Sequence, residues 1–131
     1  MPITYTLDRE RRRMVTRAEG LLTREDLEHH LDVEALDHAE EFAELFDATG
    51  ATTDVSAEDI RGLVDRARQW QAAGISVGPT AIVATSDVVY GMARMYAMLA
   101  EFLNAPVEVF REIGPALEWL DHISPASPRH T

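Results

Sequence analysis

The sequence predicts one α/β domain: a five-stranded, mostly parallel sheet that opens with an antiparallel hairpin and has four helices packed on it. Three observations predict this fold class. A length of 131 residues suits one domain, an alternating apolar pattern opens the chain, and strand and helix patterns then alternate to its end. The predicted order is ββαβαβαβα, and right-handed crossovers leave only a few topologies for it.

The first predicted element is a β-hairpin over residues 3–19. Apolar and polar side chains alternate over residues 3–8 and again over residues 14–18, which is the period of a half-buried strand. A charged turn separates the two runs, and Gly20 ends the second. We therefore expect two antiparallel strands at one edge of the sheet.

A capping pattern predicts the first helix. Thr23 and Asp26 form a Thr-x-x-Asp pattern, in which the threonine is expected to be the N-cap and the aspartate replaces the usual glutamate. The helix is predicted to end within residues 35–38. Residues 42–48 are then predicted to form a short strand, closed by a Thr-Gly turn.

The same capping pattern recurs before the second helix. Ser56 and Asp59 precede an apolar stripe of helical period that stops at Gly74. Residues 80–85 are continuously apolar in their middle, which is typical of a strand covered on both faces. A long helix is predicted over residues 86–103.

A strand over residues 107–110 and a helix with Pro115 in its first turn complete the predicted domain. The domain spans residues 1–123. The Ser/Pro-rich segment over residues 124–131 is predicted to be disordered.

Composition excludes several function classes. Without cysteine, the chain has no disulfide, thiolate zinc site or cysteine nucleophile. A net charge of −11 argues against nucleic-acid binding, and no secretion signal opens the chain, so we expect a cytoplasmic protein. The chain lacks lysine, a phosphate-binding loop, a Gly-x-Ser-x-Gly elbow and a dinucleotide fingerprint. We therefore predict no enzymatic activity and no cofactor.

The hairpin is more basic than the rest of the chain. Five arginines lie among the first 19 residues, against three acidic residues. These charges either discourage edge-to-edge strand pairing or bind an anion or lipid headgroup, and we favour the first interpretation. The five are Arg9, Arg11, Arg12, Arg13 and Arg17.

The most distinctive stretch covers residues 81–96 and reads Ala-Ile-Val-Ala-Thr-Ser-Asp-Val-Val-Tyr-Gly-Met-Ala-Arg-Met-Tyr. Together with residues 107–111 and 116–120, it resembles the SpoIIAA-like family. That family groups with the STAS domains and is sometimes compared with SEC14-type lipid binders. The resemblance covers nearly the whole chain, as far as Leu120. It implies a small bacterial regulatory or ligand-binding module without catalysis, and in some members one that holds a lipid-like molecule or meets a membrane.

Anti-sigma-factor antagonists of this group switch by phosphorylation of a serine in an Asp-Ser-Ser/Thr-Gly motif at a helix start. The matching region here, residues 54–59, reads Asp-Val-Ser-Ala-Glu-Asp, so Ser56 is present and the motif is not. A helix N-terminus would stabilise a phosphate, whereas Glu58 and Asp59 would repel it. We favour an N-cap role for Ser56. The alternative function is a protein–protein regulator that acts through the Ser56 helix.

The predicted helix over residues 86–103 is apolar on nearly all sides and therefore needs cover from a ligand, a second subunit or a membrane. We predict an apolar groove beneath it for a lipid-like, fatty-acid-like molecule, with Arg94 as polar anchor stacked on Tyr90. A homodimer is favoured over peripheral membrane contact, because anionic lipid repels this acidic chain. The candidate lining residues are Tyr90, Met92, Met95, Tyr96, Leu99 and Trp119.

Two residues of this helix each allow two interpretations. Arg94 either contacts a ligand or pairs with a carboxylate at the edge of the core. Gly91 costs about 1 kcal/mol relative to alanine in a helix. Either the close approach of a ligand or backbone, or a tight contact between helix and strand, would justify that cost.

His30, Glu34 and His38 recur every four residues and so share one helix face. Two imidazoles and a carboxylate suit zinc. The sequence lacks a His-Glu-x-x-His motif, however, and Leu27 and Leu31 point in nearly the same direction. We therefore interpret the histidines as solvated or satisfied within the core, and predict no metal site.

Overall fold

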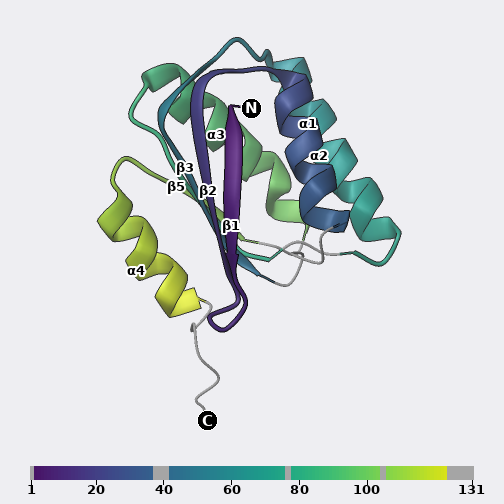
Figure 1. Ribbon diagram of the computed structural model, residues 1–131. Coiled ribbons are helices and arrows are strands. Elements are labelled where there is room, and N and C mark those ends of the chain that lie inside the picture. The colour runs from purple at the N-terminus through teal and green to yellow at the C-terminus, as the bar shows by residue number, and fades with distance from the viewer. Residues whose placement is uncertain (1, 37–41, 76–77, 104–105, 124–131) are drawn as a thin grey trace.

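Five strands form one mixed sheet in the computed structural model, which describes residues 2–36, 42–75, 78–103 and 106–123 (Figure 1). The elements follow the predicted order ββαβαβαβα. They are β1 (Ile3–Asp8), β2 (Arg13–Leu22), α1 (Arg24–Leu36), β3 (Ala43–Thr53), α2 (Ala57–Ala72), β4 (Thr80–Val83), α3 (Asp87–Leu99), a 3₁₀ turn (Ala100–Leu103), β5 (Val107–Phe110) and α4 (Ile113–Ile123).

The strands lie side by side in sequence order, β1-β2-β3-β4-β5. β1 pairs antiparallel with β2 and every later pair is parallel, so the predicted fold class is confirmed. The β3 strand extends beyond the predicted residues 42–48. Gly50, predicted to lie in a turn, instead pairs with Glu19 just after a register shift in β2, and the pairing continues to Thr53. The register shift accommodates Gly50, and β3 continues beyond it.

The predicted helix starts are confirmed. The backbone N–H of Thr23 donates to Asp26 at 3.0 Å, and the N–H of Asp26 donates to the Thr23 hydroxyl at 3.2 Å. Ser56 and Asp59 form the same reciprocal capping box at α2. Ser86 caps α3, but the regular helix ends at Leu99 and gives way to the 3₁₀ turn.

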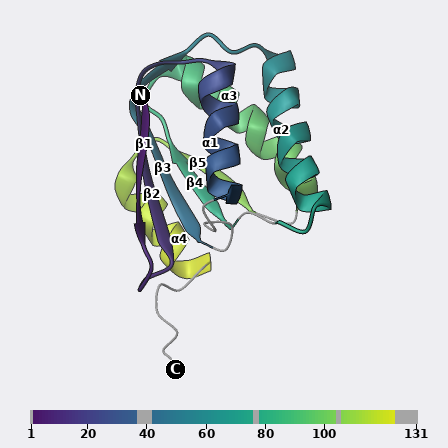
Figure 2. The same ribbon diagram turned by 45° about the vertical axis from the view of Figure 1, so that its right-hand side comes forward.

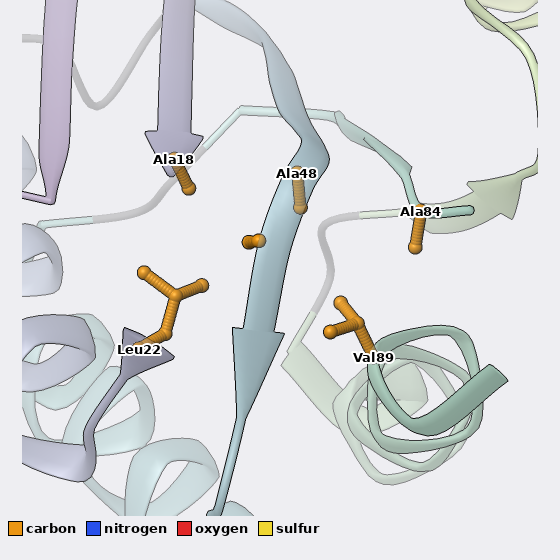
Figure 3. Close-up of a cluster of buried hydrophobic side chains, with 6 residues drawn as sticks. Ala18, Leu22, Ala48, Ala84 and Val89 are labelled. Carbon is orange, nitrogen blue, oxygen red and sulfur yellow. The ribbon is translucent and has the colours of Figure 1, made fainter. Parts of the chain in front are cut away.

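Helices cover both faces of the sheet: α1, α2 and α3 lie on one side and α4 on the other (Figures 1 and 2). Because side chains alternate along a strand, Leu45 of β3 packs with Leu120 of α4, whereas Phe46 faces the three helices. On the three-helix face, Leu22, Ala48 and Val89 belong to one buried cluster and point toward one another (Figure 3).

The hairpin arginines have different environments. Arg11 and Arg17 are exposed, and each pairs with a carboxylate of the same hairpin, at 3.7 and 3.3 Å. Arg13 is buried and donates to Asp121 of α4 at 3.0 Å. These three arginines therefore have intramolecular partners.

Two predictions concern residues outside the described ranges: the disordered tail over residues 124–131, and the position of His38. Within the described part of the chain, no helix is long and apolar enough to cross a membrane.

Candidate functional site

A cavity of about 130 Å³ lies between the sheet and the three helices that cover it. Its wall is mostly apolar and receives side chains from both layers, among them Leu27 of α1, Ile60 of α2 and Met92 of α3. Ala48 of β3 and Ala93 of α3 also line it. Because an alanine fills less volume than the larger aliphatic residues around it, these two positions help to leave the space open.

Three titratable side chains interrupt the apolar wall. His30 and Glu34 of α1 and Glu44 of β3 are only 7%, 2% and 3% exposed. The Nε2 atom of His30 lies 2.8 Å from Oε2 of Glu44, and the Thr16 hydroxyl donates to the same oxygen at 2.5 Å. Glu34 also hydrogen-bonds with Glu44. Two carboxyl groups can bond to each other only when one of them holds a proton.

The environment indicates which groups are neutral. Burial raises the pKa of Glu34 well above its ordinary value, and the neighbouring Glu44 raises it further. Burial also raises the pKa of the Tyr96 hydroxyl, with smaller contributions from the two carboxyl groups. These surroundings favour the neutral form of Glu34 and of the Tyr96 hydroxyl.

Surrounding contacts fix the position of α1 and hence of His30 and Glu34. The Arg66 guanidinium of α2 makes two hydrogen bonds to Asp32, at 2.8 and 2.6 Å, and holds the pKa of that carboxyl below its usual range. The Trp70 indole N–H donates to Asp32 at 3.0 Å. Asp32 lies between His30 and Glu34 in the sequence, so these bonds hold α1 against α2 beside both residues of the cavity wall.

Aromatic rings fix the imidazole itself. His30 packs edge-on against Tyr5 of β1, with ring centroids 6.3 Å apart, and against Phe46 of β3, at 5.5 Å. An imidazole held in this way keeps its Nε2 atom toward Glu44.

The structure brings only part of the predicted site together. Met92 and Tyr96 line the cavity as expected for one face of a helix. Met95 and Leu99 point away from the cavity and pack against the buried cluster of Val55, Ile60 and Leu63, at the start of α2. They support the helix pair without lining the cavity.

The remaining predicted residues lie elsewhere. Arg94 is exposed, and the cation over the Tyr90 ring is Arg111, 3.9 Å from its centroid, so the predicted stacking of Arg94 on Tyr90 is not observed. Arg111 reaches this position because β5 ends beside the start of α3, where it also pairs with Asp87 at 3.0 Å. Trp119 lies on the opposite face of the sheet, since α4 crosses to that side.

Sequence reasoning missed Glu44 and so missed the cluster. His30 and Glu34 have a recognisable helical spacing, but Glu44 lies on a strand, and no local pattern links a strand to a helix. One signal was available: Glu44 is a charged residue directly between the apolar Ala43 and Leu45 in a segment predicted to be a strand. A charge at such a position has to be paired when the strand is buried.

Two solved structures share this architecture. An uncharacterized protein of the DUF3478 family with a SpoIIAA-like fold, from Shewanella loihica, is 21% identical, with a TM-score of 0.57 over 90% of this chain and 93% of that one. The anti-sigma factor antagonist SpoIIAA in its unphosphorylated form is 16% identical, with a TM-score of 0.52 over 92% and 96%. The chain has a SpoIIAA-like fold. No family model and no curated protein matches the sequence.

Within this SpoIIAA-like fold, Ser56 lies exposed at the start of α2 and acts as the predicted N-cap. Its hydroxyl accepts from the N–H of Asp59 at 3.1 Å, and Asp59 accepts from the N–H of Ser56 at 2.9 Å. The hydrogen bond from the Ser56 backbone lowers the pKa of Asp59. Arg24 of α1 also reaches Asp59, at 3.3 Å.

Proposed function

We propose that this chain is a non-catalytic module that binds a compact, mainly apolar small molecule in the cavity under α3. The observation that supports the proposal is the cavity itself, with its largely apolar wall and one buried polar cluster. Sites for small molecules are typically apolar, with a few placed polar groups that orient the ligand.

The size of the cavity limits which ligands can fit. An apolar cavity of about 150 Å³ admits benzene, and this one measures about 130 Å³. Of the fatty-acid-like ligands expected from the sequence, we therefore propose only those of the size of an aromatic ring or a short, branched chain. A carbonyl or hydroxyl on it would form a hydrogen bond with the Tyr96 hydroxyl.

Native mass spectrometry before and after organic extraction tests whether the purified protein carries such a molecule. A small added mass that disappears on extraction supports the proposal and identifies the occupant. Where none co-purifies, NMR titrations with benzene, indole and butyrate measure the binding capacity of the empty cavity. A protein that carries no small mass and shows no shift change with any of these probes contradicts the proposal.

A matched pair of variants locates the binding. Ala93→Leu places a larger side chain at a buried position of α3 that lines the cavity, and Val88→Leu makes a similar change at an exposed position of the same helix. We expect probe-induced shifts around Met92 and Tyr96 in the wild type and in Val88→Leu. They should be lost in Ala93→Leu.

Self-association through α3 is the second part of the proposal. Val88, Met98 and Phe102 are 54%, 64% and 78% exposed along α3 and the 3₁₀ turn, and a peripheral membrane contact would use the same surface. We expect a dimer in the native mass spectrum and a monomer for Phe102→Glu. Leu117→Glu, on α4, is the control. A dimer that survives Phe102→Glu excludes this surface.

A protein–protein regulator acting through Ser56 is the alternative. It is supported by the exposed serine at the start of α2 and by the likeness in fold to an anti-sigma factor antagonist. Ser56→Asp should change the set of captured partners, whereas Ser56→Asn keeps an equivalent N-cap and should not. Identical partner sets for both variants, together with an unmodified mass of the natively expressed protein, remove the phospho-switch.

A further inference from the structure

We propose that His30, Glu34 and Glu44 form a binding site for a divalent transition-metal ion, of which Zn²⁺ is the best match, at the wall of the cavity. One imidazole and two carboxylates make up a donor set that such ions accept. The three side chains come from two elements, α1 and β3, that only the tertiary fold brings together.

The distances suit one ion. Ligand atoms of the three residues lie within 4.8 Å of one another. An ion with bonds of about 2.0–2.2 Å separates neighbouring ligand atoms by about 3.0–3.5 Å. His30 Nε2 and Glu44 Oε2 are already 2.8 Å apart, so small side-chain rotations bring all three groups to coordinating distance.

Charge gives an independent reason. Two carboxyl groups and one imidazole are buried together; Glu44 accepts a hydrogen bond from Thr16, and its Oε2 lies 2.8 Å from His30 Nε2. Buried carboxylates are normally paired or bound to a metal. A divalent cation at this position would compensate the negative charges of both carboxylates at once.

The surroundings already contain the second layer of contacts that metal sites use. The Thr16 hydroxyl orients Glu44, the rings of Tyr5 and Phe46 orient the imidazole, and α1 is held by the Arg66–Asp32 pair. Such outer contacts fix ligand orientation before the ion arrives. With three protein ligands, the ion would keep a coordination position for water or for a donor atom in the cavity.

The site combines two of the three residues of the helical pattern found in the sequence with a residue that the pattern did not contain. His30 and Glu34 share one face of α1, one turn apart, and Glu44 of β3 supplies the third ligand. The inference does not rest on the proposed small-molecule function, because the ion would bind whether or not the cavity is occupied.

Calorimetry on chelator-treated protein titrated with Zn²⁺ provides the test, with Co²⁺ as a second probe whose visible spectrum reports nitrogen and oxygen ligation. Glu34→Gln keeps the shape of the side chain and a donor toward Glu44, so the metal-free variant should fold. Loss of an outer contact alone costs 10–100-fold in metal affinity, so loss of this ligand should cost about 100-fold or more. Glu118→Gln, exposed on α4, should leave the affinity unchanged.

Two further variants test how much His30 and Thr16 each contribute to metal binding. His30→Gln should abolish the Co²⁺ spectrum, while His122→Gln, exposed on α4, should preserve it. Thr16→Val removes only the hydroxyl that orients Glu44 and should weaken Zn²⁺ binding about 10-fold. Thermal melts in chelator confirm that each variant is folded. Equal affinity in the wild type and Glu34→Gln, or no saturable binding of either ion, overturns the site and leaves a proton-sharing network.

Discussion

The two faces of the sheet differ in how completely they are filled. Under α4, Val83, Ala116 and Leu120 are fully buried in one aliphatic cluster. Under α1, α2 and α3, a cavity of about 130 Å³ remains, and His30 and Glu44 are buried at its wall. One helix thus packs closely against the sheet, while three helices on the other face leave space.

This difference in packing separates the face that stabilises the domain from the face that is suited to binding. Close packing maximises dispersion contacts, whereas an unfilled volume and buried polar groups each reduce the stability of the fold. A face that keeps both features gives up stability that tighter packing would supply. We infer that the α4 face stabilises the domain and that the three-helix face is the place where a molecule or ion binds.

Truncating a core residue on each face should give the largest difference. Leu120→Ala, at a fully buried position, should lower the free energy of unfolding by about 3–5 kcal/mol. Met92→Ala, at a half-buried position that already borders the cavity, should cost less than about 2 kcal/mol. Urea unfolding of both variants measures the two values. Equal costs would mean that the faces are packed alike.

Enlarging an alanine should likewise cost more stability on the α4 face than on the three-helix face. Ala116→Leu overpacks the filled α4 face and should cost about 1–3 kcal/mol. Ala93→Leu extends into the cavity and should be neutral or stabilise by up to about 1 kcal/mol. Denaturant midpoints at unchanged m-values distinguish these outcomes. If Ala93→Leu lowers the free energy of unfolding by more than about 1 kcal/mol, the cavity does not accommodate the larger side chain.

Local patterns predicted the fold more fully than the site. Thr23 and Ser56 fix helix starts through contacts three residues away, so their signals are local and visible in the sequence. The site depends on Glu44 meeting His30 across two elements, which only the packing of α1 on the sheet decides. Arg111, which takes the place over Tyr90 expected for Arg94, was missed for the same reason.

Two helical glycines on the three-helix face should respond differently to alanine. A Cβ added at Gly91 meets no atom outside its own helix and chain neighbours within 4 Å, so the tight contact between helix and strand offered as one explanation for this glycine is not observed. Gly91→Ala should therefore stabilise by about 0.5–1 kcal/mol. A Cβ at Gly62 would overlap the guanidinium of Arg24, which must then move.

Comparing the thermal midpoints of the two variants checks this. Gly62→Ala gains the same helix propensity but disturbs the pairs that Arg24 makes with Glu28 and Asp59. Its net gain should be smaller than that of Gly91→Ala. If Gly91→Ala is destabilising in the purified protein, an additional molecule or subunit must approach α3 at that position.

The smallest expected effect is a pH dependence at the start of α2, on the edge of the three-helix face. Hydrogen bonds from Ser56 lower the pKa of Asp59 below its ordinary value of 3.8. A carboxyl group whose pKa is lower in the folded state contributes stability above its unfolded pKa, and that contribution is lost as the pH falls through the folded pKa. The wild type should therefore lose stability relative to Asp59→Asn below about pH 4, with the difference constant near neutrality. Because Asp59 is at the surface, solvent keeps this effect small.

Unfolding of the wild type and of Asp59→Asn across this pH range measures the effect, with Glu118→Gln as control. A stability difference between the two proteins that does not depend on pH would show that the capping box contributes no charge-dependent stability.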